Sequence, residues 1–302
     1  MDSVEVNDAP EAHGTGTSTA ASRAIGTLAP QNCPTCGSTP VSGRASAPNY
    51  VYAIGRIDAR FPRQSVEKEF AQVSGKNETS GLTDRQTLQK VLSERQNRYL
   101  ARQLCWVMII GGLETYILVP RDPSDLELFL EALRAAPSPG DLDCVIGIQG
   151  PNAPPEFCNG LMVPIVIVDH MYSFHRNELI GAIPRPEDAH GEEFTRAAEE
   201  VFDRVMQITD NAGATDEHRA LNYLALRYPA IYATAANAFK ANRSLTGVNV
   251  VPSALGGTRK VVDVIFSFTD RKTDFLEKFF ARVDVTEEFP FLRTRLTPYY
   301  DR

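Results

Sequence analysis

The sequence predicts a single α+β domain, because strand-like segments gather toward both ends of the chain and helical segments lie between them. Two short turns, Gly111-Gly112 and residues 269–273, each separate a pair of β-rich runs and so predict antiparallel hairpins near both ends. Residues 192–208 carry the clearest helical pattern, with apolar side chains at i, i+3, i+4 and i+7. The expected fold therefore packs antiparallel hairpins against a central group of helices.

The N-terminal region has a different composition from the rest of the chain. It is rich in Ala, Ser, Thr, Gly and Pro and holds almost no large apolar side chains. Such a segment buries too little surface to offset its ordering entropy, so residues 1–30 are expected to form a disordered tail. A globular core is expected over residues 50–302, preceded by a short cysteine motif at residues 33–37.

The first half of the core alternates between strand and helix signals. Residues 51–59 show the period of two that is typical of a strand. Ser65 is expected to cap a short helix, and Thr83 with Gln86 forms a capping box that opens another. Residues 104–110 and 113–119 flank Gly111-Gly112, and a tight two-residue turn would place Cys105 opposite Leu118.

The elements that follow are read in the same way. Asp122-Pro123 begins a helix, and residues 144–148 and 163–168 are apolar enough to be buried strands. After the long helix, Thr215 caps a second helix and Pro229 opens a third. Residues 260–268 and 276–286 form the C-terminal hairpin.

Charge and composition exclude several classes of function. The net charge is -7 and no Lys/Arg run relieves it, so nucleic-acid binding is not expected. No apolar run approaches the roughly 20 residues of a membrane span, and the N-terminus lacks the apolar segment of a signal peptide. The five cysteines are an odd number at uneven spacing, which suits a reducing compartment, so a cytoplasmic protein is expected.

Seven segments of the chain are long and unusual. They are Tyr52-Ala53-Ile54-Gly55-Arg56-Ile57, Arg60-Phe61-Pro62, Val66-Glu67-Lys68-Glu69-Phe70, Arg98-Tyr99-Leu100-Ala101-Arg102-Gln103-Leu104-Cys105-Trp106, Cys158-Asn159-Gly160-Leu161-Met162-Val163-Pro164, and the segments over residues 210–223 and 285–292. They resemble the C-terminal domain of the PatG-type cyanobactin maturation proteases, and the resemblance covers residues 31–302. The resemblance implies a role in a pathway that makes modified, often macrocyclic, ribosomal peptides.

The protease domain that precedes this region in the full-length proteins is absent from the sequence. His13-Gly14-Thr15 and Gly16-Thr17-Ser18-Thr19-Ala20 mimic the His and Ser motifs of subtilisin-like proteases. A Ser-His-Asp triad is defined by its geometry on a rigid core, and here the two motifs adjoin within a polar tail. The sequence therefore does not predict a subtilisin-like protease.

Cys33-Pro34-Thr35-Cys36-Gly37 has the form of a zinc-knuckle half-site. The remaining ligands must come from elsewhere, and Cys105 and Cys158 are preferred because both lie within the segments of the resemblance. The prediction is a structural zinc bound by Cys33, Cys36, Cys105 and Cys158, which tethers the N-terminus to the core. Cys144 or a histidine as one ligand, a free thiol pair and a redox pair are the alternatives.

Other ionisable groups are candidates for binding or catalysis. Arg56, Asp58 and Arg60 share one strand face and can either clamp a peptide or form a solvated ladder. The cluster around His218 is expected to be a charged helix start, with a general base as the alternative. Asp169-His170 is expected to form a surface turn after the strand that ends at residue 168.

The function expected from these features is that of a non-catalytic interaction domain. It would recruit a precursor peptide or a pathway enzyme, with Arg56, Arg60 and His218 as the candidate ligand-binding residues. Two alternatives remain open: an uncharacterised enzyme that acts on the peptide, and an assembly module that forms a homodimer. A pocket lined by the ionisable residues would favour the enzyme, whereas a flat surface or sheet-edge groove would favour binding.

Overall fold

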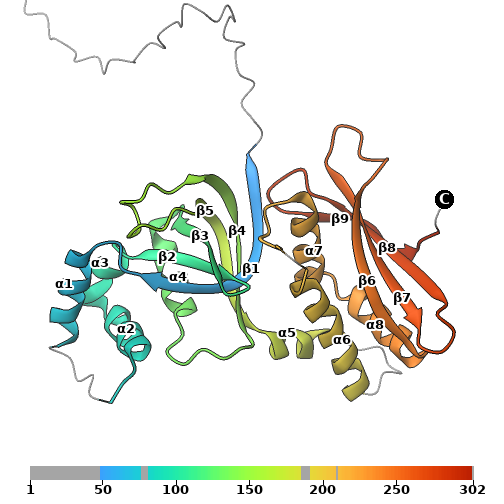
Figure 1. The fold of residues 1–302 in the computed structure, drawn as a ribbon, viewed down its shortest axis with the longest axis horizontal. Helices are drawn as coiled ribbons and strands as arrows, with labels where there is room; N and C mark the ends of the chain where they lie inside the picture. Colours follow the sequence, from blue (N-terminus) through green and yellow to red (C-terminus); the bar gives the residue numbers. More distant parts are fainter. Residues whose placement is uncertain (1–47, 76–80, 185–190, 209, 301–302) are drawn as a thin grey trace, which may run out of the picture. The chain divides into compact units, whose positions relative to one another are not determined.

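A computed structural model describes residues 48–75, 81–184, 191–208 and 210–300, all within one compact unit. The predicted tail, the zinc knuckle with Cys33 and Cys36, and the His13 and Ser18 motifs lie outside these described residues. Within the described residues the fold is α+β, with two separate sheets (Figure 1).

The first sheet is a five-stranded closed barrel with the strand order β1-β2-β3-β5-β4. Neighbouring strands are antiparallel except β3 and β5, which run parallel over four residue pairs. The strands are β1 (Asn49–Arg60), β2 (Cys105–Ile110), β3 (Leu113–Pro120), β4 (Asp141–Asn152) and β5 (Pro164–His175).

Short helices connect the barrel strands and bury their apolar faces against them (Figure 1). Trp106 on β2 and Phe129 pack with ring centroids 5.4 Å apart at the centre of this core. These helices are α1 (Gln64–Ser74), α2 (Asp84–Ser93), α3 (Arg98–Ala101) and α4 (Leu126–Ala132), with 3-10 turns η1 (Arg95–Asn97) and η2 (Pro123–Asp125).

The second sheet is a four-stranded antiparallel meander in the order β6-β7-β8-β9, and helices α6, α7 and α8 pack against it (Figure 1). Phe194, Phe202, Phe266 and Phe268 are fully buried in the shared core. The elements are α5 (Arg176–Ala182), α6 (Gly191–Met206), α7 (Asp216–Arg227), α8 (Ala230–Lys240), β6 (Arg243–Pro252), β7 (Val261–Asp270), β8 (Leu276–Asp284) and β9 (Phe291–Pro298).

Helix α7 joins the two halves, because it contacts β1 of the barrel as well as β7 of the second sheet. The Asn222 side chain on α7 donates to the Tyr52 carbonyl of β1 at 2.8 Å and exchanges hydrogen bonds with Asn211. Tyr223 and Leu226 pack against Tyr52 and Ile146 on the barrel. A polar and an apolar contact therefore fix the same helix to the barrel.

Several sequence predictions are confirmed. Thr83 and Gln86 form the capping box of α2, and Thr215 caps α7. Gly111 and Gly112 both have positive φ, 58° and 86°, as the predicted two-residue turn requires. None of the helices among the described residues combines the length and hydrophobicity that a membrane span requires.

Other predictions are wrong in detail. Helix α1 begins at Gln64 after Arg63, whose side chain forms no cap, so Ser65 is not the N-cap. The β2–β3 register shifts between Met108 and Ile109, so Leu118 pairs with Trp106 rather than with Cys105. Most importantly, the strand predicted over residues 163–168 continues to His175, so Asp169 and His170 lie within β5 instead of in a turn.

Candidate functional site

Cys105 and Cys158 lie side by side although 53 residues separate them in the sequence. Their Cα atoms are 6.0 Å apart and their sulfur atoms are bonded to each other. Cys105 begins β2 and is 4% exposed, and Cys158, in the loop between β4 and β5, is fully buried. The structure therefore brings together the two cysteines that the sequence analysis assigned to one site.

The chemistry of this cysteine pair fits half of a tetrahedral zinc site. If the bond between their sulfur atoms is reduced, the thiolates of Cys105 and Cys158 would supply two of the four sulfur ligands that such a site needs. Among the described residues, no group of three or more His, Cys, Asp or Glu can hold a metal, so further ligands must come from elsewhere. Cys33 and Cys36 lie outside the described residues.

Cys144 does not belong to this pair. It is fully buried with Tyr52 and Ile146, in a different apolar cluster from Cys105 and Cys158. Burial raises the pKa of the Cys144 thiol to about 12, so it remains protonated near neutral pH. Because zinc binds the thiolate, Cys144 is a poor ligand where it stands.

The charged ladder on β1 is partly used within the protein. Nη1 of Arg60 donates to both carboxylate oxygens of Glu114, each at 2.7 Å, and Asp58 pairs with Arg85 at 2.9 Å. Arg56 is exposed. The N–H of Ile57 donates to the Asp143 carboxylate and that of Ala59 to the Asp58 side chain, so neither is free to pair with an added strand.

His218 lies in the first turn of α7, where its backbone N–H donates to the Thr215 hydroxyl at 3.1 Å. Burial lowers the pKa of its imidazole, and Nδ1 is buried without a hydrogen-bond partner among the described residues. Asp216 lies 3.6 Å from Arg219 and 3.5 Å from Lys260. These contacts agree with a charged helix start and provide no partner that would activate His218 as a base.

Arg219 holds the loop between β8 and β9 against α7. Arg219 is 2% exposed, and its guanidinium donates to the carbonyls of Val285, Glu287 and Glu288, the first at 2.7 Å. Sequence reasoning missed this role, although Arg219 stands in the first turn of a capped helix where an acidic residue is the usual choice. The consequence is a fixed position for Phe289 and Pro290 at the other end of this loop.

Phe289 and Pro290 form one wall of a pocket of about 480 Å³ between the barrel and α7, which we call the seam pocket. The other lining side chains come from β1, β4, β5 and α7. They are Tyr52, Ile146, Asp169, His170, Tyr223 and Arg227. The volume lies within the usual range of small-ligand sites, and the lining combines aromatic surface with a few polar groups.

Two buried tyrosine hydroxyls lie close to Arg227, but of the two residues only Tyr52 lines the seam pocket. Tyr52 is 2% exposed, and both its hydroxyl and that of Tyr172 are buried. Burial is the main cause that raises the pKa of each phenol, so both remain protonated donors near neutral pH. The Arg227 guanidinium lies over the Tyr172 ring, 5.1 Å from its centroid.

Asp169 at the rim of the seam pocket is neutralised by Arg121, which binds both of its carboxylate oxygens, one of them at 2.9 Å. This pairing lowers the pKa of Asp169. Nearby Glu288 is half-buried; burial and the Asp169 carboxylate raise its pKa to about 7. His170 is exposed, with its ring 5.8 Å from that of Tyr172, and no hydrogen bond among the described residues orients it.

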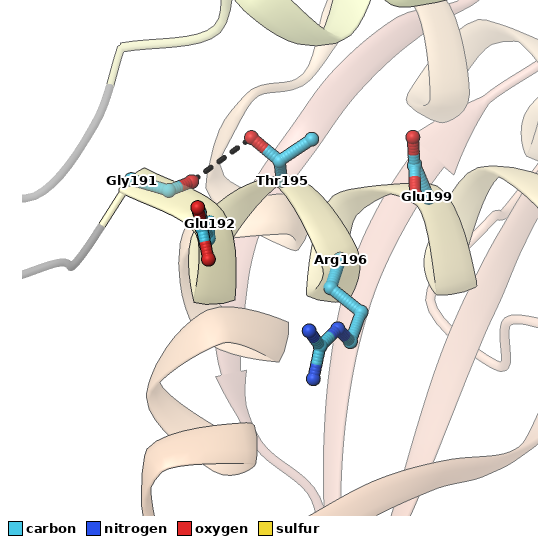
Figure 2. A pocket seen from close by; sticks show the side chains of 5 residues that line it. All are labelled: Gly191, Glu192, Thr195, Arg196 and Glu199. Atoms are coloured by element: carbon cyan, nitrogen blue, oxygen red, sulfur yellow. Dashed lines mark hydrogen bonds between the residues drawn. The ribbon is translucent and has the colours of Figure 1, made fainter.

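A second hollow, of about 520 Å³, lies on the first turns of α6 (Figure 2). Figure 2 shows the Thr195 hydroxyl donating to the Gly191 carbonyl, with Glu192, Arg196 and Glu199 along the same helix. Arg196 and Glu192 are exposed, and among the described residues no buried polar group lines this hollow. It therefore offers less for a ligand to recognise than the seam pocket does.

Comparison with known proteins agrees with the resemblance seen in the sequence. Residues 188–299 match the family model described as PatG C-terminal. No curated protein matches the chain. A solved structure described as the PatG domain of unknown function is similar, with a TM-score of 0.67 and 23% identity over 83% of this chain and 98% of that chain. At this identity, the structural likeness establishes the fold.

Proposed function

Because this chain carries a PatG C-terminal-type domain, we propose that it is a non-catalytic binding domain in the maturation of ribosomally made, cyanobactin-like peptides. Its partner is a precursor peptide or an enzyme that modifies the peptide, in the cytoplasm. The domain extends over residues 31–302 after a tail of 30 residues.

The observation that carries this proposal is the composition of the seam pocket. It holds aromatic surface from Tyr52, Tyr223 and Phe289 together with one arginine, which suit binding. Acid–base or nucleophilic catalysis needs a reactive group that is oriented by a second one. The Asp169 carboxylate is bound by Arg121, and His170 has no orienting partner among the described residues. A lining that includes Asp169 and His170 is the outcome that the sequence analysis counted in favour of an enzyme. We nevertheless propose binding, because neither residue is an activated group among the described residues.

A direct test is equilibrium binding of the full chain to fluorescently labelled precursor peptides encoded beside its gene, measured by anisotropy. Saturable binding that unlabelled peptide reverses supports the proposal. The candidate residues from the sequence are tested in the same titration with Arg56→Glu, Arg60→Glu and His218→Ala. The charge reversals are expected to weaken binding of an acidic peptide, and His218→Ala to leave it unchanged.

A structural zinc is the second part of the proposal, with Cys33, Cys36, Cys105 and Cys158 as its ligands. The convergence of Cys105 and Cys158 supports it, but the ion requires this pair in the reduced, thiolate form. Zinc so held would stabilise the connection between the N-terminal knuckle and the barrel. Metal analysis is expected to find about one equivalent of zinc per chain. If no zinc is found, and two of the cysteines in the unfolded protein do not react with a thiol reagent, Cys105 and Cys158 form a disulfide instead.

The assembly role is the alternative, and the second sheet supplies its supporting observation. Among the described strands, β6 and β9 each pair on one side and so form the edges of that sheet. An open edge can pair with a second copy of the chain. Light scattering that gives twice the 33.3 kDa of one chain, without any binding of precursor peptide, would favour this role.

A further inference from the structure

We infer that the seam pocket binds the carboxy terminus of a peptide whose last side chain is apolar. The inference deepens the proposed function, on which it rests for the assumption that the ligand is a peptide. Three features of the pocket lead to it: an arginine without an acidic partner, a neutralised rim, and an exposed apolar wall.

Arg227 supplies the positive charge. It is exposed in the last turn of α7, and the groups that act on its pKa are Tyr52, Tyr172 and Cys144, none of which is a carboxylate. Position near a helix C-terminus explains a positive charge, and the interaction with Tyr52 leaves most of the five N–H donors of the guanidinium available. Its stacking over Tyr172 holds the planar group beside the pocket, where a carboxylate can bind in bidentate fashion.

The hydroxyls of Tyr52 and Tyr172 are buried and do not open onto the pocket. Tyr52 interacts with both Tyr172 and Arg227. The two phenols therefore help to hold the guanidinium in place, and Arg227 is the group that can bind a carboxylate.

The rim of the pocket does not repel an anion strongly. Asp169 is the one carboxylate on the lining, and its charge is balanced by the Arg121 guanidinium. Glu288, which is close to Asp169, carries a proton part of the time near neutral pH because its pKa is about 7. The free charge at the pocket is therefore that of Arg227.

The opposite wall explains why the terminal side chain should be apolar. Phe289 is 54% exposed although it is a large hydrophobic residue, and it lies beside Pro290, Ile146 and Tyr223. The Arg219 guanidinium binds three backbone carbonyls of the loop that carries Phe289, and so fixes this loop. The wall therefore exists before the ligand binds. An apolar side chain placed against Phe289 would cover it, while the neighbouring carboxylate reaches Arg227.

The test uses ligand-detected NMR on the full chain, with N-acetylphenylalanine as the probe and its carboxamide as the matched control. The acid is expected to bind in the millimolar range, and the amide at least about fivefold more weakly. Arg227→Gln is expected to weaken binding of the acid about tenfold. Arg295→Gln, at an exposed arginine of β9 outside the pocket lining, should not change it.

Equal affinity for the acid and the amide, or full binding to Arg227→Gln, would overturn the inference, and so would absence of acid binding. Thermal unfolding of each variant shows whether a loss of binding reflects a loss of fold, and the amide control needs no substitution at all. The same experiments test the proposed function independently. If N-acetylphenylalanine binds through Arg227 but no precursor peptide binds, the carboxylate site is supported and the assignment to precursor peptides is wrong.

Discussion

Gly213 and Tyr52 join the helical half of the protein to the barrel through their backbones. The Tyr52 N–H donates to the Gly213 carbonyl at 2.8 Å, and Gly213 adopts a φ of 75°. A Cβ atom on Gly213 would lie 2.3 Å from the Tyr52 carbonyl oxygen, so no larger residue fits without moving β1. Because Tyr52 lines the seam pocket, this contact also sets the position of the pocket floor.

Gly213→Ala is therefore expected to destabilise the protein by more than about 3 kcal/mol, since it combines positive φ with a backbone clash. Gly257→Ala is the matched control. Gly257 has a φ of 59°, but nothing lies within 4 Å of a Cβ placed there. That variant should lose only about 1 kcal/mol. Urea unfolding measures both, and equal losses would show that the close approach to Tyr52 costs nothing.

Arg219→Met is expected to cost about 2–4 kcal/mol, because three carbonyls of the β8–β9 loop lose a charged donor. Arg295→Met, at an exposed position on β9, should change stability by less than about 0.5 kcal/mol. Hydrogen exchange adds a local readout, since the backbone amides around Phe289 should lose protection only in the Arg219 variant. Unchanged protection would contradict the proposed role of Arg219 in fixing the loop.

The raised pKa of Glu288 predicts a stability difference that depends on pH. In the folded protein its pKa is about 7, chiefly because of burial, against about 4.3 in an unfolded chain. The stabilisation associated with protonated Glu288 is complete below the unfolded pKa and is lost as the pH rises through about 7. Wild type should therefore lose stability relative to Glu288→Gln between pH 5 and pH 8.

Comparing these two proteins isolates Glu288 from other titrating groups. The lowered pKa of His218 has the opposite effect in part of this range, because the unfolded chain binds a proton there that the fold excludes. That effect is common to both proteins and cancels in the difference. Asp169, whose pKa is lowered, is ionised throughout this range. Parallel stability profiles from pH 5 to pH 8 would refute the assignment.

The cysteine substitutions separate the proposed zinc ligands from a buried thiol. Cys105→Ala and Cys158→Ala are expected to lose the metal and to destabilise the domain, because each removes one of the four proposed ligands. Cys144→Ala should retain it, since Cys144 lies in another apolar cluster with a pKa raised to about 12. Metal analysis of the three purified variants gives the answer. Loss of zinc only in Cys144→Ala would show that the ligand set is wrong.

The sequence predicted most of the elements whose signals are local. Helix α6 follows from its apolar spacing, and the starts of α2 and α7 follow from the side chains of Thr83 and Thr215. Closure of the barrel was not predicted, because it depends on pairing between β1 and β4, which are distant in sequence. Strands β6 and β9 were missed as well; both are edge strands, where burial is weak and alternation is easily hidden.

The candidate sites also differ in whether the sequence alone could indicate them. Cys105 and Cys158 could be associated in advance, because both lie in segments that resemble one family. The seam pocket could not, since its residues come from separate elements and none has a recognisable spacing. The pocket depends on the unpredicted extension of β5 past residue 168. This extension places His170 and Tyr172 on a strand that faces α7. Only the tertiary arrangement shows that Arg227 and the two phenols are neighbours.

The most direct test of the central claim, that this domain binds its peptide without changing it, combines calorimetry with intact-mass spectrometry of the same mixture. The full chain is titrated with the precursor peptides encoded beside its gene, and the peptide is then weighed. We predict heat of binding with an unchanged peptide mass, for wild type as well as for His170→Ala and His218→Ala. A change in peptide mass that wild type produces and that either histidine variant abolishes would contradict the account.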